Sequence, residues 1–325
     1  MRGNSSKAGI YDFMYRFERE LQVRRSFEKE RNNMQDIMNT TDIAFPNIGL
    51  YLENVPSGFY IGGFFIALYG VVIGIGVITG IMLAARAAKY TGMDPDDVWD
   101  FAIYAVIFSV LGARIYYIVF AWDSYKNDLL SVFNFRQGGL AIYGAVIGAF
   151  ITLFIYSKLK KRSPFHLGDC GVIGLVWGQV LGRWGNFFNR EVFGEYSDGL
   201  FAMRLPIEAI RDRTDITENI RAHIAEGTNY IQVHPTFLYE SGLNLLLFIF
   251  MFWYQKHKKF HGEICLLYLG GYGIIRFFIE GIRTDQLKFA GTNIAVSQVL
   301  GLVLFIASVG METIIRFKLR KKQKQ

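Results

Sequence analysis

Residues 54–85 read NVPSGFYIGGFFIALYGVVIGIGVITGIMLAA, a stretch without a single Asp, Glu, Lys or Arg. About 20 apolar residues in a helix are enough to cross the hydrocarbon core of a bilayer, which is roughly 30 Å thick. Residues 137–157 and 289–311 are equally free of charged side chains. Charged residues make up 19% of the chain, against about 25% in an ordinary soluble domain. The sequence therefore predicts an integral membrane protein.

Outward from these runs, the chain contains seven apolar segments that we interpret as transmembrane helices. The fourth and sixth have charge-free cores, 170–182 and 264–275, that are short for a span. We include them because their charged residues fall at positions that suit a function. The predicted fold class is an all-α polytopic membrane protein, with about seven transmembrane helices and a small extracytoplasmic segment between helices four and five. The segments are about 58–85, 98–120, 138–157, 165–182, 236–254, 262–281 and 293–314.

The net charge of +7 comes largely from short basic runs beside apolar segments, such as 158–162 and 316–324. Cytoplasmic loops carry such an excess of Lys and Arg, so the pattern argues against nucleic-acid binding. It predicts an N-terminus outside and a C-terminus in the cytoplasm. The domain prediction is a polar N-terminal extension (1–45), a membrane domain (46–315) whose residues 183–235 lie outside, and a basic cytoplasmic tail (316–325). RFERELQVRRSFEKERNNM, residues 16–34, is compatible with a soluble or surface-lying helix.

The two cysteines, Cys170 and Cys265, both fall inside apolar segments. They form neither a disulfide framework nor a metal-binding spacing. The chain also begins without an apolar stretch that precedes a cleavage site, so no secretory signal peptide is visible.

Four segments place ionisable or polar residues beside apolar spans, and a charge within the membrane is a functional hypothesis because it is costly there. Under the predicted topology all four lie at the outer ends of their spans, which suggests one cavity. Arginine is well suited to phosphate oxygens, so an anionic lipid headgroup is the natural ligand. Arg114, within the second span, is a further buried charge. The segments are GRWGNFFNREVFG (182–194), YGIIRFFIEGIR (272–283), HPTFLYES (234–241) and RQGGLAIYGA (136–145).

Each segment has a simpler interpretation that stays open. Arg183 could simply extend its guanidinium to the membrane interface without binding anything. Arg276 and Glu280 lie on one helical face with Tyr272, so they could form a purely structural ion pair. His234 could cap or pack the helix that Pro235 opens. Tyr143 could be an interfacial anchor.

The chain resembles the prolipoprotein diacylglyceryl transferase family. The family's G-R-x-G-N-F-x-N-x-E-x-x-G signature matches residues 182–194 at every fixed position, its H-P-(T/S)-x-L-Y-E segment matches 234–240, and its Y-G-x-x-R-F-x-x-E segment matches 272–280. GARIYYIVF, residues 112–120, is similar to the family's second helix. The resemblance extends from about residue 42 to about residue 315.

The resemblance implies transfer of the diacylglyceryl group of phosphatidylglycerol to the thiol of a lipobox cysteine in a prolipoprotein. Glycerol phosphate leaves, and neither a metal nor a soluble cofactor is required. The implied catalytic residues are Arg183, Arg276, Tyr143 and Glu280, the two arginines holding the phosphate. The implied substrate-binding residues are Arg183, Asn186, Asn189, Glu191, Gly194, Tyr272, Glu240, His234, Arg114 and Arg283.

One departure concerns the thiol base. The family often has His-Gly-Gly where this chain has Tyr143-Gly144-Ala145, which leaves the residue that takes the thiol proton open. Two alternatives therefore remain: a phosphatidylglycerol-binding paralogue without transfer activity, and a membrane transporter. No pair of corresponding broken segments favours a transporter.

Overall fold

The computed structural model describes residues 38–126, 129–133 and 138–323, so the predicted helix within 16–34 lies outside the described residues. The chain forms two compact units. The first combines the residues up to Ser57 with Phe188–Pro235, and the second combines Gly58–Phe187 with the residues from Thr236 onward. Each is considered by itself.

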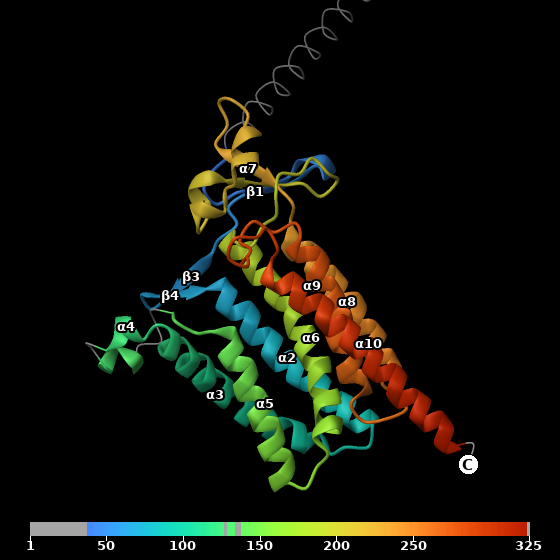
Figure 1. The fold of residues 1–325 in the computed structure, drawn as a ribbon. Coiled ribbons are helices and arrows are strands. Elements are labelled where there is room, and N and C mark those ends of the chain that lie inside the picture. Colours follow the sequence, from blue (N-terminus) through green and yellow to red (C-terminus); the bar gives the residue numbers. More distant parts are fainter. Residues whose placement is uncertain (1–37, 127–128, 134–137, 324–325) are drawn as a thin grey trace, which may run out of the picture. The chain divides into compact units, whose positions relative to one another are not determined.

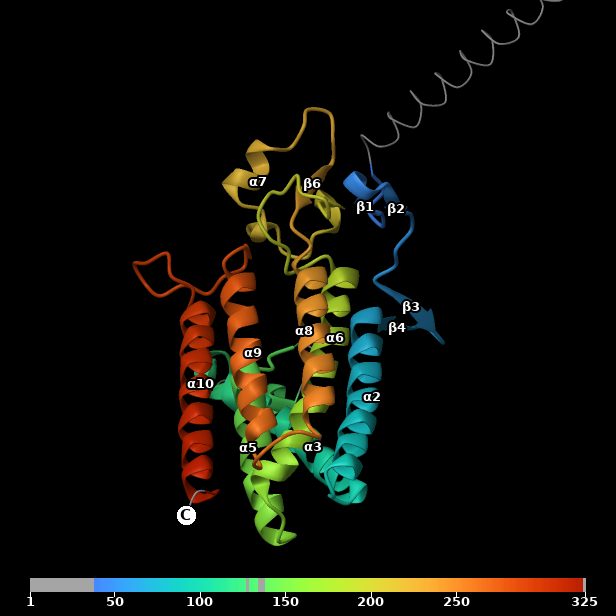
Figure 2. The ribbon, with the colours of Figure 1, turned by 90° about the vertical axis from the view of Figure 1, so that its right-hand side faces the viewer.

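Seven of the described helices contain 18 or more residues, and Figures 1 and 2 show them side by side. The close pairs are α3 with α5 and α9 with α10, and α2 also contacts α3 as α8 contacts α9. The helices are α2 (Leu68–Tyr90), α3 (Pro95–Phe120), α5 (Ile142–Leu159), α6 (Pro164–Asn189), α8 (Thr236–Tyr254), α9 (Glu263–Glu280) and α10 (Val296–Gln323), with the short α4 (Trp122–Tyr125) and a 3-10 turn at Leu129–Phe133 between α3 and α5.

Five of these helices, α2, α3, α5, α8 and α10, are long and apolar enough to cross a membrane. Their apolar side chains are mostly on the outside: only 11% of the apolar window of α3 is buried, and at most 33% in any of the five. Monomeric soluble proteins rarely expose apolar surface of that extent, so a lipid exterior explains it. α6 and α9, which correspond to the two short predicted segments, are helical but interrupted by charged residues.

The helix starts follow local chemistry. α3 begins at Pro95, where the Asp94 side chain accepts a hydrogen bond from the Asp96 N–H at 3.1 Å, which is the usual arrangement of an N-cap followed by proline. α8 begins directly after Pro235, as predicted.

The predicted start of the first span at residue 58 is wrong. Residues 58–67 form a β-hairpin of β3 (Gly58–Ile61) and β4 (Phe64–Ala67), and α2 begins only at Leu68. Gly62 and Gly63 both have positive φ, 55° and 84°, as a two-residue hairpin turn requires. The apolar composition of the segment hid the Gly-Gly turn signal.

Glycines allow pairs of helices to approach closely. A Cβ atom on Gly174 would lie 2.5 Å from the Gly80 carbonyl oxygen, and one on Gly273 would lie 2.6 Å from that of Gly301. Helices in lipid commonly associate through such small residues. Gly80 and Gly174 thus allow α2 and α6 to pack closely, whereas a Cβ on Gly178 would meet no described atom within 4 Å.

Gly174→Ala is therefore expected to lower the stability of the protein by about 1–3 kcal/mol, the usual cost of overpacking. Gly178→Ala, one turn further along α6, is the matched control, and because it meets no clash it should raise stability by up to about 1 kcal/mol through the helix preference of alanine. Thermal unfolding in detergent measures both. Equal melting temperatures for the two variants would contradict this account of helix packing.

The beginnings of α6 and α9 contain a buried polar cluster that was not predicted from the sequence. Asp169, 2% exposed, accepts hydrogen bonds from Lys258 Nζ at 2.9 Å and from the backbone N–H groups of Gly262 and Cys265 at 2.9 and 3.0 Å. Glu263 is fully buried and pairs with Arg316. Asp169 therefore joins α6 to the turn between α8 and α9, and the Glu263–Arg316 pair joins α9 to α10.

The first unit is built on a four-stranded antiparallel sheet in the order β2-β1-β5-β6. Fully buried Ile43, Leu205 and Ile231 belong to its strands. The elements are β1 (Ile43–Phe45), β2 (Leu50–Leu52), β5 (Met203–Pro206), β6 (Tyr230–Val233), α7 (Glu218–Ala222) and 3-10 turns at Pro46–Ile48, Ile207–Ala209 and Arg213–Asp215.

Candidate functional site

A buried carboxylate, Glu240 of α8, lies between two arginines from different helices. Arg183 Nη2, from α6, is 2.9 Å from Glu240 Oε1, and Arg276 Nη1, from α9, is 3.6 Å from Oε2. The Glu240 side chain is 1% exposed, whereas the arginine side chains are 20% and 15% exposed. The carboxylate of Glu240 is thus buried beneath the two arginines, and both guanidinium groups remain partly accessible.

Each arginine has a second partner that fixes its orientation. Arg183 Nη1 donates to Asn186 Oδ1 at 3.2 Å, one turn further along α6. Arg276 Nη2 pairs with Glu280, which is 3% exposed. That ion pair confirms the prediction that residues 276 and 280 share a face of α9. Tyr272, one turn before Arg276, is close enough to interact electrostatically with both Arg183 and Arg276.

Arg283 extends this charged cluster past the end of α9. Its Nη1 lies 3.9 Å from Glu280, and its Nε and Nη2 donate to the two oxygens of Asp285 at 2.9 and 2.6 Å. Alternating arginines and carboxylates therefore continue from Arg183 to Asp285. We call Arg183, Glu240, Arg276, Glu280 and Arg283 the arginine cluster.

In low dielectric, an arginine pair held by carboxylates is preorganised for a phosphate ester. A guanidinium presents five N–H donors in a planar fork, and the contacts above use only part of them. Charge-assisted hydrogen bonds from such forks to phosphate oxygens are among the strongest in proteins. The arrangement therefore suits binding of a phosphodiester and stabilisation of the negative charge that develops when its ester bond breaks.

The predicted site residues of the first unit form a separate set. Asn189 Nδ2 donates to Glu191 Oε1 at 3.1 Å, and Arg211 Nη1 pairs with Glu191 Oε2 at 2.8 Å. The Gly194 N–H donates to the His234 carbonyl at 3.0 Å. Burial lowers the pKa of His234, so its imidazole is neutral near pH 7.

The structure gives Arg114 and Tyr143 other surroundings. Arg114 is 4% exposed and donates to the backbone carbonyls of Ser131, Val132, Gly138 and Gly139 at 2.8–3.1 Å. It therefore organises the loop between α3 and α5. Tyr143, in the first turn of α5, is 45% exposed, with its ring 6.3 Å from that of Tyr116.

Two arginines near Glu191 were not predicted as site residues from the sequence. Arg190 lies within the 182–194 motif at a variable position, and Arg211 lies in a polar loop without a motif. No group of three His, Cys, Asp or Glu side chains suited to a metal ion is found within the described part of the chain. The absence of a cofactor stays a prediction.

Comparisons with a family model and with known proteins point to the same family. The family model described as prolipoprotein diacylglyceryl transferase matches residues 56–314. A phosphatidylglycerol–prolipoprotein diacylglyceryl transferase of Clostridium botulinum strain Langeland is 38% identical over 252 residues, which cover 77% of this chain and 94% of that protein. A protein of the same name from Listeria monocytogenes serotype 4a is 38% identical over 266 residues, 81% of this chain and 91% of that protein.

Proposed function

Because this chain belongs to the prolipoprotein diacylglyceryl transferase family, we propose that its arginine cluster binds phosphatidylglycerol and drives diacylglyceryl transfer to a prolipoprotein. The chain is a bacterial membrane enzyme, a phosphatidylglycerol–prolipoprotein diacylglyceryl transferase. The proposal adds the acceptor atom, the thiol of a lipobox cysteine, and the residues that act. The observation that carries it is Glu240 with Arg183 and Arg276 on either side.

The proposed reaction is a displacement at the glycerol carbon that carries the phosphate ester. The thiolate sulfur forms a bond to this carbon, the carbon–oxygen bond breaks, and its electron pair leaves with glycerol phosphate. The thiol proton goes to solvent or to a base. Negative charge grows on the phosphate oxygens as the bond breaks, so Arg183 and Arg276 bind the transition state more tightly than the ground state.

The neighbouring residues have positioning roles. Glu240 and Glu280 orient the two guanidinium groups, and Asn186 accepts a hydrogen bond from Arg183, with Tyr272 close by. We assign Asn189, Glu191, Gly194, His234 and Arg283 to lipid or acceptor binding. For Arg114, contacts to four backbone carbonyls favour an indirect role, through the loop before α5.

The direct test is incubation of the purified protein with phosphatidylglycerol and a lipobox peptide, followed by mass spectrometry. The expected result is a peptide mass gain of one diacylglyceryl group, with one glycerol phosphate released per peptide. An unmodified peptide with bound phosphatidylglycerol would instead support the paralogue without transfer activity.

We expect the protein to be active with tyrosine at position 143. A cysteine thiol has an ordinary pKa of about 8.5, so roughly 3% is thiolate at pH 7, and nearby positive charge raises that fraction. Tyr143→Phe should cause a moderate loss of activity with little change in the pH profile, and Tyr143→His should be tolerated. Transfer by Tyr143→His together with an inactive wild type would overturn this account of the thiol.

The proposed topology places seven spans in the bacterial inner membrane, because α6 and α9 pack among the five strongly apolar helices. The N-terminus and the segment from the end of α6 to Pro235 lie outside, and the C-terminus lies in the cytoplasm. In intact cells, a membrane-impermeant thiol reagent should label Asp215→Cys and spare Lys160→Cys, with the wild type as the background for Cys170 and Cys265. Labelling at position 160 would show that the proposed orientation is inverted.

A further inference from the structure

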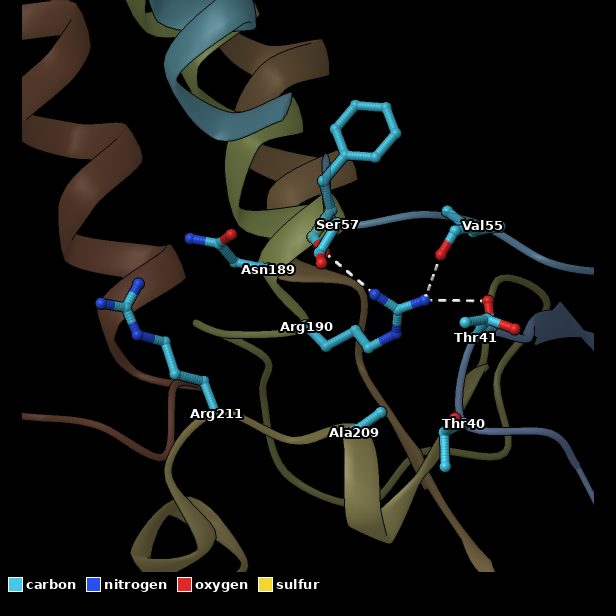
Figure 3. Close-up of a pocket in the computed structure, with 9 residues that line it drawn as sticks. Thr40, Thr41, Val55, Ser57, Asn189, Arg190, Ala209 and Arg211 are labelled. Carbon is cyan, nitrogen blue, oxygen red and sulfur yellow. Dashed lines mark hydrogen bonds between the residues drawn. The ribbon is translucent and has the colours of Figure 1, made fainter. Parts of the chain in front are cut away.

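A cavity of about 370 Å³ with a mixed polar and apolar lining lies within the first unit, around Arg190 (Figure 3). Pockets that bind small ligands or parts of larger ones range from about 300 to 1,000 Å³. Thr40, Ser57, Asn189, Arg190, Ala209 and Arg211 are among the residues that line it. All belong to this unit, and among them Asn189 is also assigned to lipid or acceptor binding above.

Arg190 is buried, with 5% of its surface exposed, and is anchored by three backbone carbonyls. Its Nη2 donates to the carbonyls of Thr41 and Val55 at 2.8 and 2.6 Å, and its Nη1 donates to that of Phe188 at 3.0 Å (Figure 3). Its Nε makes no hydrogen bond to any residue that the structure describes. In Figure 3 this edge of the guanidinium faces Thr40 and Ala209, across the cavity.

Retaining an arginine here is costly. Arg190 has a φ of 52°, a left-handed conformation that favours glycine. Its burial also removes water from a charged group, and a buried N–H without an acceptor carries a further penalty. An acceptor on a ligand within the cavity would remove that last penalty.

The lining indicates the class of ligand. Arg211 is already paired with Glu191 at 2.8 Å, and Nη1 and Nη2 of Arg190 donate to backbone carbonyls. The cavity therefore offers a ligand the single Nε–H of Arg190 and not the two-pronged fork that binds a phosphate. The other polar side chains of the lining include the hydroxyls of Thr40 and Ser57 and the amide of Asn189, whose Nδ2 also donates to Glu191. Such a mixture suits a polypeptide main chain, which supplies a carbonyl acceptor and an N–H donor at each residue.

We propose that the Arg190 cavity binds the polypeptide segment that follows the modified cysteine of a prolipoprotein, with a main-chain carbonyl accepting a hydrogen bond from Arg190 Nε. The inference rests on the proposed function, since it takes the polypeptide acceptor from there. The first unit contains none of the five apolar helices. This unit is therefore suited to the polar part of the acceptor that lies beyond the bilayer.

The test compares two lipobox peptides, one ending just after the cysteine and one continuing for about ten residues, roughly 33 Å when extended. Arg190→Gly removes the guanidinium and suits the positive φ. Ala209→Trp fills the cavity and leaves Arg190 in place, which keeps the test decisive if Arg190→Gly does not fold. Arg213→Gly, an exposed arginine of the same unit, is the matched control.

Fluorescence anisotropy of labelled peptides measures binding without turnover, so an inactive enzyme would refute the proposed function without deciding this inference. Both test variants should weaken binding of the long peptide by about tenfold or more, the scale for losing one hydrogen bond to a charged group. The affinity for the short peptide and the KM for phosphatidylglycerol should stay the same in both test variants. The Arg213→Gly control should bind both peptides as the wild type does. Equal losses for both peptides, no loss for either, or competition by glycerol phosphate would overturn the proposal.

Discussion

Arg183→Ala and Arg276→Ala should each reduce the rate of diacylglyceryl transfer by roughly 10²–10³-fold, the usual effect of removing one preorganised donor to a developing oxyanion. Each guanidinium lies against Glu240 and keeps an accessible edge, 20% of the side chain for Arg183 and 15% for Arg276. A phosphodiester at that edge would receive charge-assisted hydrogen bonds that strengthen as its ester bond breaks. The initial rate of peptide modification, with phosphatidylglycerol limiting, measures the loss.

The lysine variants refine this prediction. Lysine keeps the positive charge but lacks the planar fork, so Arg183→Lys and Arg276→Lys should restore little activity. Arg86→Ala is the matched control, because Arg86 is exposed in α2 and donates only to Tyr90 among the described contacts. Full activity in either alanine variant would remove that arginine from the mechanism.

Glu240→Gln should have the second largest effect, on both stability and activity. The carboxylate is 1% exposed and is the acidic partner of Arg183, whereas Arg276 also pairs with Glu280. Removing one partner of a buried ion pair costs about 3–5 kcal/mol, because the remaining charge loses its compensation. Activity should fall with the altered orientation of Arg183.

Glu280→Gln is the comparison variant. Arg276 retains Glu240 in that protein, so both losses should be smaller than in Glu240→Gln. Melting temperature in detergent and transfer rate measure the two effects. A Glu280→Gln variant with a lower melting temperature and a lower transfer rate than Glu240→Gln would contradict the assignment of Glu240 as the main partner of the two arginines.

Much of the membrane part could be predicted from the sequence, because charge-free runs and helical spacing are local signals. The beginning of α8 after Pro235 and the shared face of Arg276 and Glu280 needed only neighbouring residues. The hairpin at 58–67 could not be separated from the first span, since its aromatic residues satisfy a hydropathy criterion equally well. Its Gly62-Gly63 turn was the one signal against a continuous helix.

The long-range contacts of the site could not be predicted from spacing. Glu240 is 57 residues from Arg183 and 36 from Arg276 in the numbering, and only helix packing brings the three together. The same holds for Asp169 with Lys258. Arg190 lies within the strongest motif, but its positive φ and its carbonyl partners at Thr41 and Val55 depend on the tertiary fold.

The alternative to phosphate binding is that the arginine–glutamate contacts serve stability alone, and a paired substitution separates the two. Arg183→Met combined with Glu240→Met removes both charges together. Replacing a buried ion pair by apolar residues is often neutral for stability. The double variant should therefore fold about as well as the wild type, with Arg276 still held by Glu280.

The central claim is tested most directly by the mass of a lipobox peptide after incubation with phosphatidylglycerol and either the wild type or this double variant. The account predicts that the wild type adds one diacylglyceryl group per peptide and that the folded double variant adds almost none. Transfer by the double variant at a rate close to that of the wild type would contradict it.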